Sequence, residues 1–285
     1  PIDRAQADDA INTIIAVPLN LDTRTAAYGI AEVVDENMAN AARVHAIERG
    51  VAIASRTLIA FGGAAPLHAS RLAEKLGISK IIVPKGAGVG SAIGFLNAPV
   101  AYETVRSRYA QLSLFDAAAN TRLLQSMSDE ATALAASAAG GRPLTETRGA
   151  YMRYTGQGHE IYVTIPVRAL VDSDVAMLRS AFEAAYRQLF KRHIPDSGIE
   201  IMSWSVLVST DTGTPSVLEE PELGEWIASE EKREVFDANL AMLVTADVHQ
   251  RDSLRPGHRL RGPAVVVEEG TSTLISGSFD AHVDQ

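Results

Sequence analysis

The chain has 285 residues, with 26 lysines and arginines against 35 aspartates and glutamates, which gives a formal charge of −9 at pH 7. Hydrophobic residues make up 46% and charged residues 21%, so the composition is globular and excludes intrinsic disorder. The acidic balance and the lack of a basic stripe argue against nucleic-acid binding, and no apolar run reaches the roughly 18 residues that a membrane span needs.

Two further features concern the chain as a whole. It contains no cysteine, which removes thiol chemistry and cysteine-ligated metals and fits a reducing compartment, so we expect a cytoplasmic protein. It begins at Pro1 rather than at a methionine and soon enters structured-looking sequence at Ile11–Val17. We therefore expect it to be part of a longer polypeptide.

The first hundred residues have an α/β pattern. Apolar residues recur at three- and four-residue steps between Asp22 and Gly50, which predicts one long helix capped by Asp22 or Thr23 and ended by Gly50. Three elements are expected after it: a strand at Thr57–Phe61, a helix at Leu67–Leu76 and a strand at Lys80–Val83. Both strands are almost continuously apolar, which predicts that they are parallel and buried on both faces.

The pattern changes after about Tyr109, where helices alternate with short strands and the chain becomes mostly β from Ile199 onward. The expected elements are helices at Asp116–Ala139 and Ser173–Lys191 and paired strands at Tyr151–Tyr154 and Glu160–Pro166. We therefore predict two parts, an α/β part at residues 1–108 and a smaller α+β domain at residues 109–285, with a boundary near residues 100–115.

The sharpest local feature is the glycine turn at Phe61–His68. A buried strand that runs into Gly62 and Gly63 and then into a helix brings bare backbone close to whatever lies at the carboxyl end of the strand, which is where open α/β sheets bind ligands. A tight strand-to-helix turn without a ligand explains these residues equally well.

Four segments, in order along the chain, resemble the motifs of one family. They are Phe61–Ala69, Val83–Gly94, Arg153–Glu160 and Gly262–Thr273. Together they resemble the C-terminal half of the hydantoinase A/5-oxoprolinase family, which includes N-methylhydantoinases and ketone carboxylases. The sequence departs from the usual motif at Ala65, where the family has glycine, and Ala98–Glu103 resembles the ketone-carboxylase subunits more closely.

The resemblance implies an α/β fold in which residues 1–108 form part of the second lobe of an actin-like or sugar-kinase-like ATPase. It also implies that Gly62, Gly63 and Ala64 lie beside the adenosine of ATP and that Pro66 starts the following helix. The family's phosphate-binding boxes are expected upstream of Pro1, so this chain would contribute only the adenosine side of a site for ATP with magnesium.

The activity implied by the resemblance is ATP-dependent hydrolysis of a cyclic amide such as a hydantoin or 5-oxoproline. ATP would phosphorylate the ring amide carbonyl, which water then opens. The implied partners are the upstream half of the same polypeptide and a B-type hydantoinase subunit, in an oligomer without nucleic acid or membrane. Two alternatives stay open: a subunit of an ATP-dependent acetone or acetophenone carboxylase, and a non-catalytic assembly fragment.

Several other candidates have structural explanations. Gly86–Ser91 follows a strand but lacks the sequence of a phosphate loop, and Gly270–Thr273 is typical of a β-turn. His68 could face a ligand or partner subunit or pack within its helix. His159 could form a polar cluster with Gln157 and Glu160 or lie at a solvated hairpin tip, and Arg153 and Tyr154 could serve that cluster or pair across strands. The histidines have no metal-ligand spacing, so the sequence identifies neither catalytic residues nor metal ligands.

Overall fold

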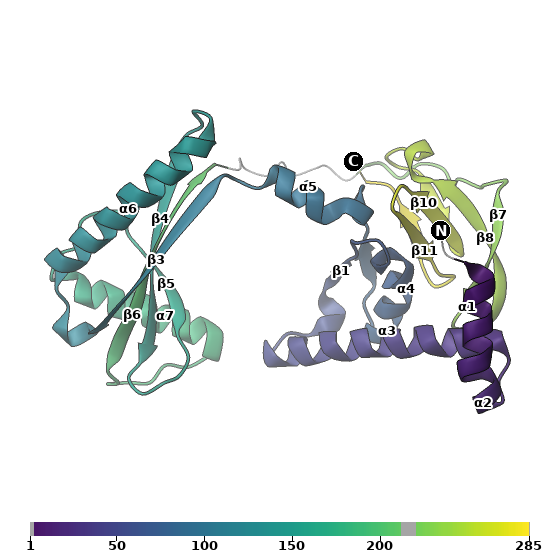
Figure 1. Ribbon diagram of the computed structural model, residues 1–285, viewed down its shortest axis with the longest axis horizontal. Coiled ribbons are helices and arrows are strands. Elements are labelled where there is room, and N and C mark those ends of the chain that lie inside the picture. The colour runs from purple at the N-terminus through teal and green to yellow at the C-terminus, as the bar shows by residue number, and fades with distance from the viewer. Residues whose placement is uncertain (1–2, 212–220, 285) are drawn as a thin grey trace. The chain divides into compact units, whose positions relative to one another are not determined.

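The computed structural model describes residues 3–211 and 221–284 (Figure 1). The chain divides into two compact units, the first built from residues before 97 and after 215, the second from residues 97–215. This grouping differs from the division at 1–108 and 109–285, which stays a prediction. None of the helices in the described residues is both long and apolar enough to cross a lipid bilayer.

The first unit opens with helices. These are α1 (Arg4–Ile11), a π-helical turn (Asn12–Ala16), α2 (Val17–Leu19) and the long α3 (Thr23–Glu48). The Asp22 carboxylate accepts a hydrogen bond from the Thr25 N–H at 3.0 Å, so Asp22 is the N-cap of α3. Gly50, just after the helix, has a φ of +62°, as expected for a glycine that ends a helix. The predicted long helix is confirmed.

The apolar stripe of α3 does not face the core of this unit. Val33, Val44 and Ile47 are 62%, 56% and 76% exposed, whereas Asp35 and Ala39 on the opposite side are buried. The buried side of α3 packs against α4 through ion pairs. The 3.6-residue spacing predicted the helix correctly, but the apolar side of the helix is exposed to solvent rather than buried.

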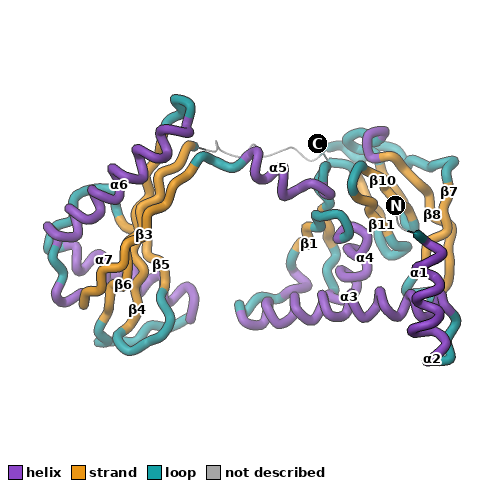
Figure 2. The backbone as a smooth tube through the Cα atoms, in the orientation of Figure 1, coloured by secondary structure: helices purple, strands orange, loops and turns teal. Residues whose placement is uncertain are grey.

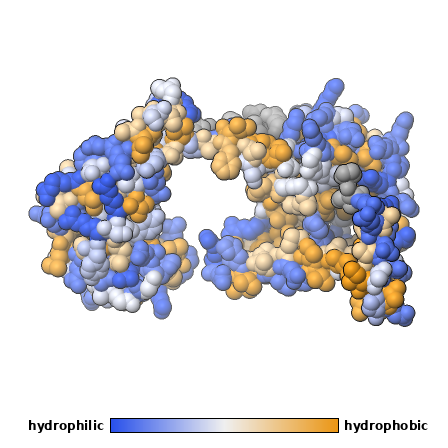
Figure 3. Space-filling view, viewed as in Figure 1, coloured by the Kyte–Doolittle hydropathy of each residue, from blue (hydrophilic) through white to orange (hydrophobic). Residues whose placement is uncertain are grey.

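The parallel strands lie next to α4. The elements are a short 3-10 helix (Ile53–Ser55), β1 (Thr57–Ile59), α4 (Ala65–Leu76), β2 (Lys80–Ile82), a second 3-10 helix (Ala87–Val89) and α5 (Gly90–Asn97). β1 pairs with β2 in parallel, as predicted. The prediction that both strands are buried on both faces is wrong, because Ile59 is 58% and Ile82 is 40% exposed. Figure 3 shows further apolar surface over α5, where Phe95 and Leu96 are exposed.

The last part of the chain adds two small sheets to the first unit. One has the order β11-β10-β8-β7, and the other pairs β12 with β9. Their bounds are β7 (Lys232–Asp237), β8 (Met242–Gln250), β9 (Arg259–Arg261), β10 (Ala264–Glu268), β11 (Thr271–Ile275) and β12 (Asp280–His282), with a 3-10 helix at Arg251–Ser253 after β8. The Ser70 hydroxyl of α4 donates to the Leu274 carbonyl of β11 at 2.7 Å, which joins helix and sheet.

The second unit is a four-stranded antiparallel sheet with helices on one face (Figure 2). Its elements are β3 (Ala101–Gln111), a 3-10 helix (Leu112–Leu114), α6 (Ala117–Ala139), β4 (Leu144–Tyr154), β5 (Ile161–Ile165), α7 (Asp174–Phe190) and β6 (Ile199–Thr210). The strand order is β3-β6-β4-β5. Alternate residues such as Met152, Tyr154 and Trp204 pack against Leu124 of α6 and Phe182 of α7. The predicted α+β character, both helices and the β4–β5 pairing are confirmed.

Candidate functional site

The glycine turn lies at the carboxyl end of the two parallel strands. The Ala60 N–H donates to the Ile82 carbonyl at 2.9 Å, and the Gly62 N–H donates to the Ala87 carbonyl at 2.7 Å. The chain leaving β1 is therefore held beside the chain leaving β2. Gly62 has a φ of +115°, which residues with a Cβ rarely adopt, so this position needs glycine for its backbone conformation alone.

Most of the predicted adenosine-binding segment is accessible. Gly63 and Ala64 are exposed and Gly62 is half-buried, whereas Pro66 is buried in the first turn of α4. A Cβ on Gly63 would lie 3.6 Å from the Gly270 carbonyl oxygen, which is ordinary contact. Residues 62–64 thus present bare backbone that a flat ligand could approach, while Pro66 can act only by shaping the start of the helix.

Two other glycine-containing segments lie against this turn. The Thr271 hydroxyl donates to the Gly63 carbonyl at 2.9 Å. A Cβ on Gly88 would lie only 2.7 Å from the Gly270 carbonyl oxygen, so the two backbones approach closely. The sequence presents residues 62–64, 86–91 and 270–273 as separate candidates, but the fold brings them together. We call these three segments the glycine cluster.

The two added segments have defined structures. Gly270, with a φ of +83°, lies in the two-residue turn between β10 and β11, so the predicted turn is found at Gly270, whereas Thr271–Thr273 belong to strand β11. Gly86 has a φ of +72° and precedes the 3-10 helix at Ala87–Val89, after which α5 begins at Gly90. The only sequence feature that these segments share is a glycine after the end of a strand. This feature does not indicate which segments contact one another.

His68 is held between two helices. Its Nδ1 lies 2.8 Å from Oδ1 of the buried Asp35, which places the imidazole of α4 against α3. The packed, hydrogen-bonded interpretation of His68 therefore describes its position in this structure.

The other predicted polar residues lie in the second unit. The Arg153 guanidinium donates to the Glu200 carboxylate at 2.9 Å, and the buried Tyr154 packs edge-on against Phe182. The His159 ring lies 6.2 Å from the ring of Phe190. Arg153 and Tyr154 thus make contacts within the sheet and its helices, whereas His159 is exposed in the connection between β4 and β5, and none of these residues belongs to the glycine cluster.

Charged residues join α3 to α4. Arg71 donates to both oxygens of Glu32, at 2.7 and 3.1 Å, and Lys75 lies 2.5 Å from the same carboxylate. These hydrogen bonds, with Arg71 the largest contributor, lower the pKa of Glu32 to about 2. Lys75 also contacts Glu36, whose pKa is lowered by Lys75 and Arg43.

This network predicts a loss of stability in acid. A carboxyl whose pKa is lower in the folded chain stabilises it fully above the unfolded pKa of about 4.3, and this contribution disappears as the pH falls toward 2. We expect Glu32→Gln to lower the thermal unfolding midpoint at neutral pH and to flatten its fall between about pH 5 and pH 2, measured by circular dichroism. Glu48→Gln, at the exposed end of α3, is the control, and an equal effect of both variants would contradict the prediction.

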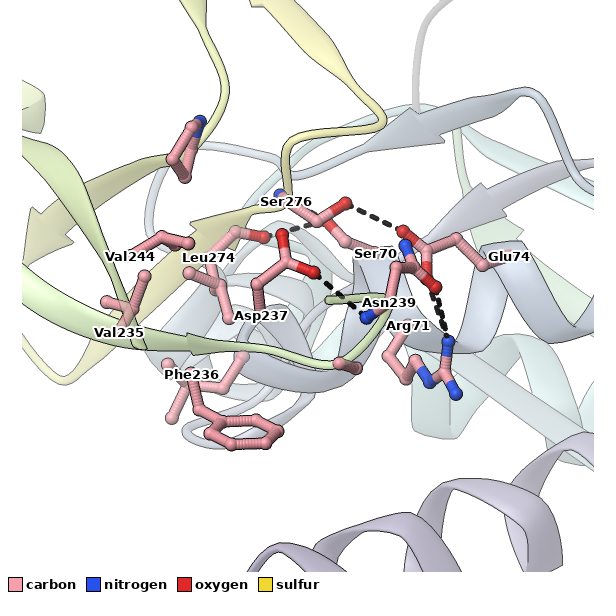
Figure 4. Close-up of a pocket in the computed structure, with 13 residues that line it drawn as sticks. Ser70, Arg71, Glu74, Val235, Phe236, Asp237, Asn239, Val244, Leu274 and Ser276 are labelled. Carbon is pink, nitrogen blue, oxygen red and sulfur yellow. Dashed lines mark hydrogen bonds and ion pairs between the residues drawn. The ribbon is translucent and has the colours of Figure 1, made fainter. Parts of the chain in front are cut away.

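Neither of the two cavities described in the first unit contains the glycine turn. One, of about 40 Å³, lies between α4 and the β7–β8 strands, and its lining includes the Ser276–Glu74 hydrogen bond at 2.8 Å and the Arg71–Asn239 hydrogen bond at 2.9 Å (Figure 4). It has room for little more than water. The other, of about 860 Å³, runs along residues 79–85 and 279–284, and Gly62, Gly63 and Ala64 do not line it.

No metal centre is present in the part of the chain that the structure describes. No group of three or more histidines, aspartates or glutamates there could hold an ion. The described residues therefore contain no cluster that would hold a metal ion by itself, whereas magnesium at phosphate sites is usually held by one or two carboxylates together with the phosphates.

The fold and the glycine cluster define a mixed α/β protein with an open glycine turn at the carboxyl end of parallel strands. A model of the hydantoinase/oxoprolinase family matches residues 1–104, and a model of the hydantoinase/oxoprolinase C-terminal domain matches residues 137–285. The chain belongs to the hydantoinase/oxoprolinase family, as the motifs predicted.

Individual relatives agree with this assignment. The chain is 28% identical to caprolactamase subunit alpha of Pseudomonas jessenii and 28% identical to the acetone carboxylase beta subunit of Xanthobacter autotrophicus, each over 99% of this chain. The matches cover 42% and 41% of those proteins, so the chain spans about two-fifths of their length. Solved structures of nucleotide-free acetone carboxylase and of the ATP-dependent caprolactamase from Pseudomonas jessenii superpose with TM-scores of 0.74 at 26% identity, over 99% of this chain and 42% of theirs.

Proposed function

We propose that this chain supplies the adenosine side of the ATP site in an ATP-dependent hydrolase of cyclic amides, of the hydantoinase/5-oxoprolinase type. The observation that carries the proposal is the exposed backbone of residues 62–64 at the carboxyl end of the β1–β2 pair. Its support comes also from relatives named as an ATP-dependent caprolactamase and a 5-oxoprolinase.

The residues present fit the adenosine of ATP. A flat ring needs close, unobstructed backbone, which Gly62 provides through its positive φ and Gly63 through its exposed position without a side chain. When bound, ATP would supply the phosphoryl group that makes an amide carbonyl reactive toward water. In this chain, residues 62–64 would bind and orient the adenosine, and no step is assigned to magnesium.

The remaining parts of the enzyme would come from outside this chain. The caprolactamase and acetone carboxylase relatives are subunits more than twice its length. We propose that the further portion of such a polypeptide covers the exposed apolar side of α3, where Ile30, Val33, Val44 and Ile47 lie open. A second, B-type subunit would complete the assembly.

A ketone carboxylase is the second candidate. Relatives named as the acetone carboxylase beta subunit and the acetophenone carboxylase gamma subunit match 99% of this chain, and residues 98–103 resemble those subunits. The longer polypeptide with its partner should be assayed for ATP-dependent turnover of hydantoins, 5-oxoproline and ketones with bicarbonate. Turnover of ketones alone would replace the first proposal by the second, and no turnover of any would favour a non-catalytic assembly fragment.

Substituting Gly63 tests the adenosine site directly. We expect Gly63→Val to weaken ATP binding at least tenfold, or about 1.4 kcal/mol, because a branched side chain would cover the backbone that the adenosine approaches. Gly63→Ala is the matched control for folding, since its Cβ would make only ordinary contact with Gly270. Titration of the folded variants with ATP measures the dissociation constants. An unchanged constant for Gly63→Val would remove the turn from the site.

A further inference from the structure

We propose that Thr271 is a positioning residue for the glycine turn, and that the β10–β11 turn holds the backbone of residues 62–64 in place for the nucleotide. The inference rests on the proposed function, because it assigns a task within the same site. It adds a residue 208 positions away in the chain, in the part matched by the C-terminal domain model, to a turn in the part matched by the first model.

The hydrogen bond from Thr271 to Gly63 carries the proposal. The Thr271 side chain is buried, and its hydroxyl donates to the Gly63 carbonyl at 2.9 Å. A carbonyl that accepts this bond is fixed in direction, and so is the planar peptide unit between Gly63 and Ala64 to which it belongs. Gly63 and Ala64 are themselves exposed, so the bond orients backbone that a ligand can reach.

The close approach of Gly88 to Gly270 supports the same role. A Cβ on Gly88 would lie 2.7 Å from the Gly270 carbonyl oxygen and 2.8 Å from its carbonyl carbon, so the two loops touch through backbone. Ala87, next to Gly88, accepts the hydrogen bond from the Gly62 N–H. The segment at Gly270–Thr271 thus contacts the glycine turn in two ways. Thr271 contacts it directly, and Gly270 contacts it indirectly through residues 87–88.

These contacts order the glycine turn before any ligand binds. Glycine-rich segments lose more backbone freedom on ordering than any other sequence, so a turn with two adjacent glycines orders poorly by itself. The Thr271 and Ala87 contacts fix it before a nucleotide arrives, which lowers the entropy lost on binding. Affinity for ATP should therefore depend on a hydroxyl that is buried away from the ligand.

The test is a set of variants titrated with ATP by ligand-observed NMR, which measures weak binding to the chain as it stands. We expect Thr271→Val to raise the dissociation constant about fivefold, the effect of one typical net hydrogen bond, and Thr271→Ser to restore it. Thr273→Val is the matched control, because Thr273 lies two residues further on the same face of β11 and its hydroxyl makes no hydrogen bond within residues 3–211 and 221–284.

A second measurement needs no nucleotide. We expect the amides of residues 62–64 to exchange with solvent faster in Thr271→Val and in Gly88→Ala, but not in Gly94→Ala, because a Cβ on Gly94 meets nothing within 4 Å. Unchanged ATP affinity in folded Thr271→Val, or failure of Thr271→Ser to restore it, would overturn the positioning role. No ATP binding by the unaltered chain would instead overturn the proposed function and this role with it.

Discussion

The purified 285-residue chain should release no phosphate from ATP, with or without magnesium and candidate cyclic amides. Phosphoryl transfer depends on positioning and on charge stabilisation of the phosphates, usually by a metal ion held by carboxylates. The described residues contain no group of three or more histidines, aspartates or glutamates that could hold such an ion, and the glycine turn lies on the surface rather than in an enclosed cavity. ATP should therefore bind weakly to this chain and remain unhydrolysed.

Phosphate release, followed over time with each candidate substrate, checks this expectation. The decisive comparison is between the unaltered chain and Gly63→Val at equal purity. Hydrolysis that survives further purification and disappears in the variant would show a complete site in this chain. The phosphate-binding groups would then have to be sought at residues 86–91 and 270–273, which belong to the glycine cluster and contact Gly62 and Gly63 respectively.

Phe182→Ala should destabilise the second unit by about 3–5 kcal/mol, which corresponds to a change of roughly 100- to several-thousand-fold in the unfolding equilibrium. The Phe182 side chain has no exposed surface and packs edge-on against the Tyr154 ring at 4.9 Å. Truncation removes these contacts and leaves a cavity between α7 and the sheet, which the neighbouring Tyr186 ring at 5.8 Å only partly fills.

The two tryptophans allow this effect to be assigned to one unit. Trp204 is buried in the second unit and Trp226 lies in the first, so Trp226→Phe leaves a single tryptophan, in the same core cluster as Phe182. Urea unfolding in this background gives the stability of each variant. Leu189→Ala, at an exposed position on the same helix, should stay within about 0.5 kcal/mol. A loss below 1 kcal/mol for Phe182→Ala would show that the core is not packed as described.

Local signals account for what the sequence predicted well. The long α3 followed from its cap at Asp22 and from apolar spacing, and the β4–β5 pairing followed from two alternating segments around a short turn. Both depend on residues close together in the chain. The four family motifs predicted the family because they are short, ordered and carried by residues that can be compared directly.

Long-range contacts account for what it did not predict. The spacing of α3 indicates an apolar side but not what covers it, and here the side that is buried carries Asp35 and ion pairs to α4. The meeting of Gly63 with Thr271 joins residues 208 positions apart, and nothing local to either turn indicates the other. The sequence indicates only a loop at Gly88. Glycine is required there because a Cβ would collide with the backbone of Gly270, which is distant in the sequence.

The chain enters and leaves the second unit at neighbouring residues, Val100 and Thr210. The Thr210 N–H donates to the Val100 carbonyl at 2.8 Å, and the Val100 N–H donates to the Thr210 hydroxyl at 3.1 Å. Bringing together the ends of an unfolded loop of roughly 110 residues would cost about 4 kcal/mol of chain entropy. Once β3 and β6 have paired, this loop is already closed, and the chain continues toward the two sequence-distant parts of the first unit from neighbouring residues. Early folding of the inserted unit would therefore speed the assembly of the unit that surrounds it in sequence.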